Sequence, residues 1–140
     1  MHGVIFEDKH SFRDWGLLLK TRPEISPPAP KLKLIQVPGS NKVIDLTESL
    51  TGQVHYEPRT ISFEFVVMAD REQWPSLYSE ILTYLHGKRI RIIMDDDPNF
   101  YYTGRVSVEG FEAEKKTAIL TMAAEVEPYK KERFGEGGRL

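Results

Sequence analysis

Three consecutive carboxylates, Asp95, Asp96 and Asp97, are the residues of this sequence with the clearest potential for chemistry. Clustered carboxylate oxygens are the ligands that Mg²⁺ and Ca²⁺ prefer. The spacing argues against a metal site, because consecutive strand residues point to opposite faces and no glycine and glutamate follow at calcium-loop offsets. We interpret the three residues as a solvated turn that Pro98 and Asn99 close.

Other catalytic patterns are missing from the sequence. The histidines are scattered without a metal-ligand pair or a carboxylate at ligand spacing, so we expect them on the surface; they are His2, His10, His55 and His86. Ser40 lies in Pro-Gly-Ser-Asn rather than in a nucleophile elbow, and no glycine-rich loop precedes a helix. The chain has no cysteine, which excludes thiolate nucleophiles and sulfur-ligated zinc. We predict no enzyme activity, no metal and no cofactor.

A candidate binding site combines the aromatic run 100–102 with nearby basic residues, which are Lys88, Arg89, Arg91 and Arg105. Aromatic side chains beside basic ones bind single-stranded nucleic acid. A carbohydrate or nucleic-acid module would use Tyr101, Tyr102 and Arg105. The alternative is an outward strand face whose arginines pair with nearby carboxylates.

The composition is that of a globular domain. Of the 140 residues, 40% are hydrophobic and 29% are charged, which indicates one folded domain rather than a disordered chain. The formal net charge of -2 gives no strong field toward nucleic acid or an anionic membrane. No apolar stretch reaches the roughly 18 residues of a membrane-spanning helix, and the first residues lack the pattern of a leader. We expect synthesis in the cytoplasm and no membrane partner.

Alternating apolar residues predict a fold made mainly of strands. Ile61, Phe63, Phe65 and Val67 recur at a period of two within residues 60–68, which places them on one face of a strand. Further strands are expected at 3–6, 17–19, 31–37, 43–46, 89–94, 101–108 and 117–126. About eight strands and one helix predict a mainly β (α+β) protein, with a β-sandwich or barrel as its core.

A single amphipathic helix is predicted at about residues 71–86. Its apolar stripe consists of Trp74, Leu77, Tyr78, Ile81, Leu82 and Leu85. Asp70 with Gln73 can serve as a capping box, and Gly87 suits the left-handed residue that ends a helix. Pro75 predicts an irregular first turn.

A proline-rich strap at 21–30 precedes a predicted hairpin at 31–46, with its turn at 38–42. The hairpin has apolar residues on both faces, with Leu32 and Leu34 on one and Ile35 and Val37 on the other. A sheet with two apolar faces in a small domain needs a second covering, which another subunit can supply. The predicted subunit interface consists of Leu32, Leu34, Ile35, Val37, Val43 and Ile44.

The last residues differ in composition from the domain at 1–129. From Tyr129 to Leu140 the chain has three glycines, four basic residues and two glutamates, with little to bury. Residues 130–140 are therefore predicted to form a flexible tail or linker.

Several short motifs follow one another along the chain. They are Gly3-Val-Ile-Phe, Ser11-Phe-Arg-Asp-Trp-Gly-Leu-Leu-Leu, Val37-Pro-Gly, Asp45-Leu-Thr-Glu, Arg59-Thr-Ile-Ser-Phe-Glu-Phe, Leu85-His-Gly-Lys and Asp97-Pro-Asn-Phe-Tyr-Tyr-Thr-Gly-Arg. No single motif is chemically specific. In their order and spacing they resemble the N-terminal, ring-forming domain of phage distal tail proteins of the siphovirus type, over about residues 3–129.

The resemblance implies a β-sandwich with a helix and an extended hairpin, assembled as a hexameric ring. Such rings join the end of the tail tube to the tail tip or baseplate, and DNA passes through their channel. The implied partners are other copies of this chain, the tail tube protein and tail-tip or baseplate proteins, with DNA only as passing cargo. The implied location is the virion tail of a phage, prophage or tail-like particle, after synthesis in the host bacterial cytoplasm.

Many members of this family continue into a galectin-like domain that attaches receptor-binding proteins. This sequence stops soon after Pro128, Tyr129 and Lys130, so we expect either a short form or a fragment. Two alternatives stay open. One is a tail tube protein or another tail component, and the other is the carbohydrate or nucleic-acid binding module described above.

Overall fold

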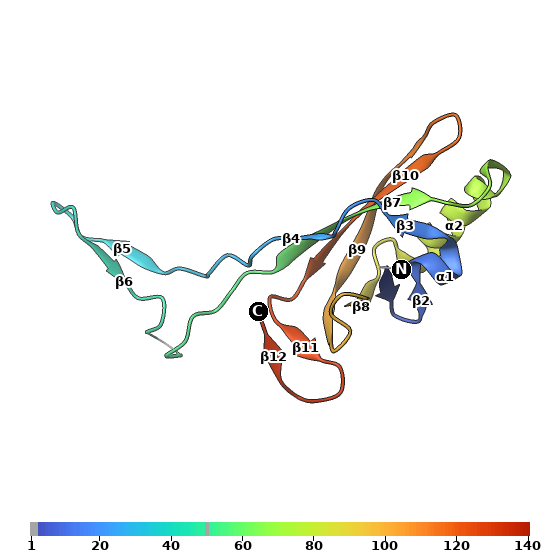
Figure 1. Cartoon of the computed structure of the whole chain (residues 1–140). Coiled ribbons are helices and arrows are strands. Elements are labelled where there is room, and N and C mark those ends of the chain that lie inside the picture. The colour runs from blue at the N-terminus through green and yellow to red at the C-terminus, as the bar shows by residue number, and fades with distance from the viewer. Residues whose placement is uncertain (1–2, 50) are drawn as a thin grey trace.

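The structure, a computed structural model, describes residues 3–49 and 51–140 (Figure 1). The helices are α1 (Ser11–Trp15) and α2 (Trp74–Leu85), and a 3₁₀ turn, η1 (Arg71–Gln73), directly precedes α2. The strands are β1 (Val4–Phe6), β2 (Lys9–His10), β3 (Leu17–Leu19), β4 (Glu24–Ile25), β5 (Leu34–Gln36), β6 (Val43–Asp45), β7 (Arg59–Val67), β8 (Arg89–Met94), β9 (Phe100–Ala113), β10 (Ala118–Val126), β11 (Lys130–Glu132) and β12 (Gly138–Arg139).

Ten of these strands form one sheet, and their antiparallel pairing confirms the mainly β fold class. The order is β2-β1-β8-β9-β10-β7-β3, with β4 paired to β7, and β11 paired to both β9 and β12. Strands β5 and β6 form a separate two-stranded sheet. The structure has more strands than the sequence predicted, because β2, β4, β11 and β12 are too short to show a hydrophobic period.

The large sheet curls so that its two ends face each other. Strands β8, β9 and β10 lie between β1 and β7 in the sheet order. Because paired strands lie about 4.8 Å apart, a flat sheet would hold β1 and β7 about 19 Å apart. The ring centroids of Phe6 in β1 and Phe63 in β7 are nevertheless 5.6 Å apart, in edge-to-face contact. The two packed layers are therefore halves of one continuous sheet.

Strand β7 carries the clearest link between sequence period and packing. Ile61, Phe63 and Phe65 are fully buried, and Val67 is nearly so, whereas the polar residues between them point outward. Edge-to-face contact between Phe6 and Phe65 extends the aromatic cluster across the core. The buried face predicted for this strand is confirmed.

Helix α2 closes the core at one end of the body. Its Ile81 and Leu85 are fully buried. Trp74 and Tyr78 contact Phe111 of β9, with ring centroids 5.9 and 5.0 Å from it. The predicted apolar stripe therefore faces the sheet. Within the described part of the chain, no helix is long and apolar enough to cross a membrane.

The ends of α2 differ in part from the prediction. The turn η1 supplies the irregular first turn that Pro75 predicted. The capping box is wrong, because the Asp70 side chain makes no capping hydrogen bond. The indole Nε1 of Trp74 instead donates to the carbonyl oxygen of Ala69, at 2.9 Å. Gly87 has a φ of 75°, so the left-handed residue after the helix is confirmed.

An extended arm, residues 26–58, leaves the body after β4 and ends in the hairpin of β5 and β6 (Figure 1). Its two branches pair at few points, such as the bridge between Pro30 and Tyr56 and the hydrogen bond from Glu57 N to Ala29 O at 2.7 Å. Prolines lack the backbone donor that a continuous ladder needs, so the strap joins the large sheet only at its edge, through the two residues of β4, and not in its middle. The predicted hairpin is present with shorter strands, and Gly39 in its turn has a φ of 74°.

The C-terminal residues, for which a flexible tail or linker was predicted, form two short strands in the structure. Strands β11 and β12 pair with each other, and β11 also pairs with β9 through Lys131 and Glu132. Arg133 N donates to Asn99 O at 2.8 Å. Backbone pairing of this kind does not depend on apolar side chains, so the composition of the segment did not indicate it.

Gly104 lies at a close approach between two strand backbones. It lies in β9, opposite Val126 of β10 and Ile90 of β8. A Cβ atom at this position would lie 2.1 Å from the carbonyl oxygen of Glu125 and 2.5 Å from the Cα of Val126. Only glycine fits, because β10 approaches more closely than any side chain allows.

Candidate functional site

The hairpin at the end of the arm, hereafter the tip hairpin (β5, β6 and their turn), is the strongest candidate for an assembly surface. Its register pairs Ile35 with Ile44, Leu34 with Asp45 and Gln36 with Val43. Because paired residues share a face, the two isoleucines lie on one face and Leu34 and Val43 on the other.

The structure leaves the predicted interface residues open to solvent. Leu32, Leu34, Ile35, Val43 and Ile44 are between 44% and 59% exposed, and Val37 is half-buried. A two-stranded hairpin alone is marginally stable in water, and an apolar patch of this kind marks an interaction site. The role of these residues in subunit contact stays a prediction, which their exposure supports.

Polar contacts hold the base of the tip hairpin. The hydroxyl of Thr47 accepts a hydrogen bond from Lys33 N at 3.1 Å, and Leu46 N donates to Lys33 O at 2.8 Å. Asp45 accepts hydrogen bonds from both the hydroxyl and the backbone N–H of Thr47. These two hydrogen bonds hold the pKa of Asp45 below its ordinary value. The base is therefore ordered by local contacts, whereas the apolar faces have no covering.

The three consecutive carboxylates, Asp95, Asp96 and Asp97, each contact a different side chain. Asp96 pairs with Arg22 at 3.1 Å, and Asp97 pairs with Lys130. Asp95 accepts hydrogen bonds from Gly3 N and the His10 ring. The described residues contain no group of three or more acidic, histidine or cysteine side chains able to hold a metal ion.

His10 is buried, so the expected surface position is wrong for this histidine. Its Nδ1 accepts hydrogen bonds from Phe12 N and Arg13 N, at 3.1 and 3.2 Å, and so caps α1. Nδ1 therefore has no proton, and Nε2 donates to Asp95 Oδ2 at 2.9 Å. Asp95 lies 85 residues away in sequence, so no local spacing could indicate this contact. The pair ties β2 and α1 to the end of β8.

The other histidines have different surroundings. His55 and His86 are exposed, as expected, although His86 Nδ1 accepts a hydrogen bond from Val108 N at 3.0 Å. His2 lies outside the described residues.

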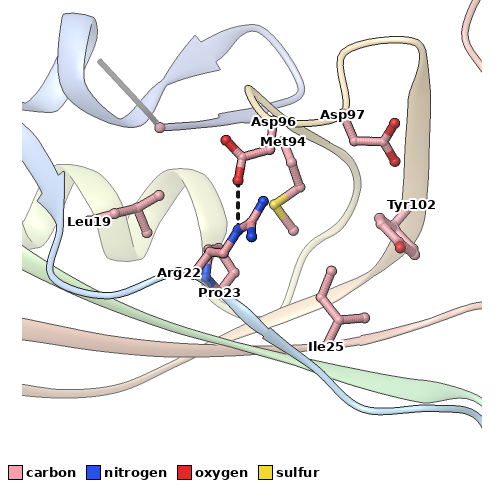
Figure 2. A pocket seen from close by; sticks show the side chains of 9 residues that line it. Leu19, Arg22, Pro23, Ile25, Met94, Asp96, Asp97 and Tyr102 are labelled. Carbon is pink, nitrogen blue, oxygen red and sulfur yellow. Dashed lines mark hydrogen bonds and ion pairs between the residues drawn. The ribbon is translucent and has the colours of Figure 1, made fainter.

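A hollow opens where the two ends of the curled sheet meet, hereafter the seam groove (Figure 2). Its volume is about 210 Å³. Its apolar wall comes from β3, the strap with β4, and the end of β8, and its rim carries Arg22, Asp96 and Asp97. The lining residues labelled in Figure 2 are Leu19, Arg22, Pro23, Ile25, Met94, Asp96, Asp97 and Tyr102. A second hollow, which shares Leu19, Arg22, Pro23 and Asp96 with the groove, continues it along Leu18 and Lys20. Sequence reasoning missed this groove because its lining comes from distant segments.

The arginines of the proposed nucleic-acid strip have local partners. Arg89 pairs with Glu127 at 2.7 Å, and Arg105 donates to the carbonyl oxygen of Gly87 at 2.7 Å. Tyr102 is buried in the core, so its ring face is not available for stacking with a base. This arrangement fits an outward strand face with paired arginines, the alternative given above.

Arg91 of the same strip pairs with Glu7 at 3.3 Å, and Glu7 also accepts a hydrogen bond from the Arg91 N–H. Partial burial raises the pKa of Glu7, but the hydrogen bonds and charge of Arg91 outweigh burial and hold that pKa below its ordinary value. The same contact raises the pKa of Arg91.

One exposed aromatic residue lies outside all of these predictions. Phe134, in the loop between β11 and β12, is 82% exposed, and the guanidinium of Arg133 lies 5.3 Å from its ring centroid. The sequence showed the aromatic residue, but its segment was interpreted as a linker.

The fold consists of a curled antiparallel sheet, one helix across its end and a long arm. Among solved structures, the Dit protein (gp 19.1) of phage SPP1 is similar to this chain, with a TM-score of 0.66 and 14% sequence identity. The match covers 94% of this chain and 52% of Dit, so this chain spans about half the length of that protein. Dit is described as a paradigm of the hub adsorption apparatus in phages that infect Gram-positive bacteria. At this identity the similarity shows a shared fold.

Comparisons at the sequence level give no match. No model of a known protein family matches this chain, and no curated protein matches it.

Proposed function

We propose that this protein is a structural component of a phage tail that assembles as a ring of six copies. The ring joins the tail tube to the tail tip or baseplate, and DNA passes through its central channel. Its partners are other copies of the chain, the tail tube protein and the tail-tip or baseplate proteins. The role is mechanical, and it requires no catalytic residue or cofactor.

The observation that carries the proposal is the tip hairpin. Its apolar side chains are about half exposed on both faces and lie at the end of an arm that extends away from the body (Figure 1). A monomer gains nothing from exposing these residues, whereas a neighbouring copy that covers them removes apolar surface from water. The fold shared with Dit of phage SPP1, a hub protein, supports a place in the tail.

The charge of the chain is compatible with a DNA channel. The formal net charge is -2, and the arginines on the outer strand faces are paired with carboxylates or carbonyl oxygens. A channel wall without unpaired basic side chains does not retain passing phosphates.

Mass photometry of the purified chain tests the proposal. We expect a species of six times the chain mass of 16.1 kDa at high protein concentration. A monomer at every accessible concentration, both alone and with the tail tube protein, contradicts it. Long filaments formed without a partner would instead support the alternative of a tail tube protein.

A further inference from the structure

We propose that the arm is hinged on the body and that the C-terminal segment, residues 127–140, holds it in one direction through a latch between the rings of Tyr56 and Tyr129. The hinge and the latch lie within one chain, so the inference goes beyond the ring proposed above and does not depend on it. It gives the C-terminal segment a role of its own, which is control of the direction of the arm.

The hinge lies where the two branches of the arm leave the body (Figure 1). On the body side, Ser26 N donates to Thr60 O at 3.0 Å, and on the arm side, Glu57 N donates to Ala29 O at 2.7 Å. The residues between these two hydrogen bonds are Pro27 and Pro28 on one branch and Pro58 and Arg59 on the other. Three of these four residues have no backbone N–H, so a continuous ladder cannot pass through this joint. The outer arm can therefore change direction at the joint without breaking a ladder of hydrogen bonds.

Beyond the joint, the arm meets the body through the latch. The ring centroids of Tyr56 and Tyr129 are 6.0 Å apart, and their planes lie at 84°, which is edge-to-face contact. Tyr56 belongs to the outer arm, whereas Tyr129 directly precedes β11, which is paired with β9 of the body. Tyr56 is half-buried and Tyr129 is exposed, so the contact lies at the surface and can open without disturbing the core.

Two hollows adjoin the latch. Their volumes are about 450 and 420 Å³, and both are lined by Tyr56 and Pro128. Close-packed protein interiors contain few voids larger than a water molecule. The hollows therefore leave space between the outer arm and the body, which a rigidly packed joint would not have.

Arg59 joins the root of the arm to the segment that carries the latch. Its Nε donates to Ser26 O at 2.9 Å, and its Nη1 donates to Pro128 O at 3.2 Å. Its guanidinium also lies 5.9 Å from the ring centroid of Tyr102, a buried core residue. The donors of a guanidinium lie in one rigid plane, so Arg59 fixes both carbonyl groups relative to the core. Because Pro128 directly precedes Tyr129, Arg59 is a positioning residue for the latch.

The strength of the latch suits a contact that opens and closes. An edge-to-face aromatic pair favours its contact by roughly 2- to 10-fold in an equilibrium constant. The closed position therefore predominates, although the open position stays accessible. A change that moves the C-terminal segment away from Tyr56 releases the arm.

Single-molecule energy transfer within one chain tests the latch, because the natural chain has no cysteine to compete for the dyes. One dye is attached at Asn41→Cys in the turn of the tip hairpin, and the other at Glu80→Cys in α2 or, in a second labelled pair, at Lys88→Cys; all three positions are exposed. The labelled chain also carries Ile35→Lys and Ile44→Lys, so that no neighbouring copy holds the tip hairpin. We expect one narrow distance distribution for each labelled pair.

Variants of the latch should broaden that distribution. Tyr129→Ala and Tyr56→Ala should each lower the ratio of the original to displaced positions by roughly 2- to 10-fold. Arg59→Met should broaden the distribution as well, because methionine keeps a long apolar stem without the donors to the two carbonyl groups. The matched control is Phe134→Ala, which removes an aromatic ring that is 82% exposed in the same C-terminal segment and should leave the distribution unchanged. Tyr56 lies outside the core cluster, so its variant keeps the test valid if another variant fails to fold.

The outcomes separate this inference from the proposed function. An unchanged narrow distribution in the tyrosine variants overturns the latch, because another contact then fixes the arm. A broad distribution in the chain that keeps both tyrosines also overturns it, because the arm is then free. Equal broadening by Phe134→Ala overturns it too, because the effect is then not specific to the latch. Each of these results leaves the ring proposal standing, since mass photometry of the unlabelled chain decides that proposal separately.

Discussion

Replacing the two isoleucines of the tip hairpin by lysine should abolish assembly and leave the folded monomer intact. The double variant Ile35→Lys/Ile44→Lys changes a cross-strand pair that lies outside the buried core cluster. Its unfolding free energy should therefore change by no more than about 0.5 kcal/mol, as for other surface substitutions.

The loss at the interface follows from the exposure of the two residues. Ile35 is 44% exposed and Ile44 is 47% exposed, so roughly half of each side chain is still available for burial against a neighbour. Full burial of an isoleucine stabilises by about 1.5–3 kcal/mol, so the remaining half is worth about 1 kcal/mol. Losing both weakens each contact by about 2 kcal/mol, a roughly 30-fold rise in the dissociation constant. The loss recurs at every contact of a ring.

The assay is mass photometry of the assembly together with urea unfolding of the same sample. The matched control, Gln36→Lys/Asn41→Lys, adds the same charge to polar positions of the same hairpin and should keep the assembly. An unchanged assembly in the isoleucine variant would refute the reasoning. A fall in unfolding free energy of several kcal/mol would refute it as well, since the residues would then belong to the monomer's core.

Three further changes test the body of the protein. Gly104→Ala should lower the free energy of unfolding by about 3 kcal/mol, measured with urea, because the added Cβ meets the β10 backbone. The control Gly110→Ala, whose Cβ meets nothing within 4 Å, should leave that free energy unchanged. Equal effects of the two substitutions would contradict the close approach at Gly104. His10→Ala should lower the free energy of unfolding by about 2 kcal/mol. His10→Asn should lower it less, because asparagine restores the cap of α1 without the contact to the end of β8. An Asn variant as unstable as the Ala variant would mean that the cap contributes little. Glu7 has a lowered pKa in the folded state, so its contribution to stability is present above its ordinary pKa of 4.5 and is lost as the pH falls through the folded value. Glu7→Gln should therefore flatten the fall of unfolding free energy with pH below 4.5, and an unchanged slope would show that the pair with Arg91 contributes nothing.

The sequence predicted those parts of the fold in which side-chain period and burial coincide. The alternation in β7, the stripe of α2 and the identical bounds of β8 all come from residues that meet one core. Glycines at positive φ could be predicted for the same local reason, as Gly87 shows.

Features set by backbone pairing or by distant contacts could not be predicted in this way. The C-terminal hairpin pairs with β9 through main-chain groups, which every non-proline residue has, so amino-acid composition does not predict this pairing. The capping of α2 failed because Asp70 precedes a 3₁₀ turn rather than the first turn of a regular helix, so its side chain has no capping geometry.

The parts of the candidate site also differ in whether the sequence could predict them. The tip hairpin was predicted because its two apolar faces occur within fifteen residues of sequence, near enough to read from local alternation. The seam groove depends on the curl of the sheet, which brings β3 close to the end of β8. The pair of His10 with Asp95 depends on the strand order β2-β1-β8, which joins distant parts of the sequence. No pattern within one segment records that closure.

Electron microscopy of the purified chain, alone and with the tail tube protein, shows directly whether the protein forms the proposed ring. We expect closed rings of six subunits with a channel wide enough for duplex DNA. Particles that remain single bodies with free arms in both samples would contradict it.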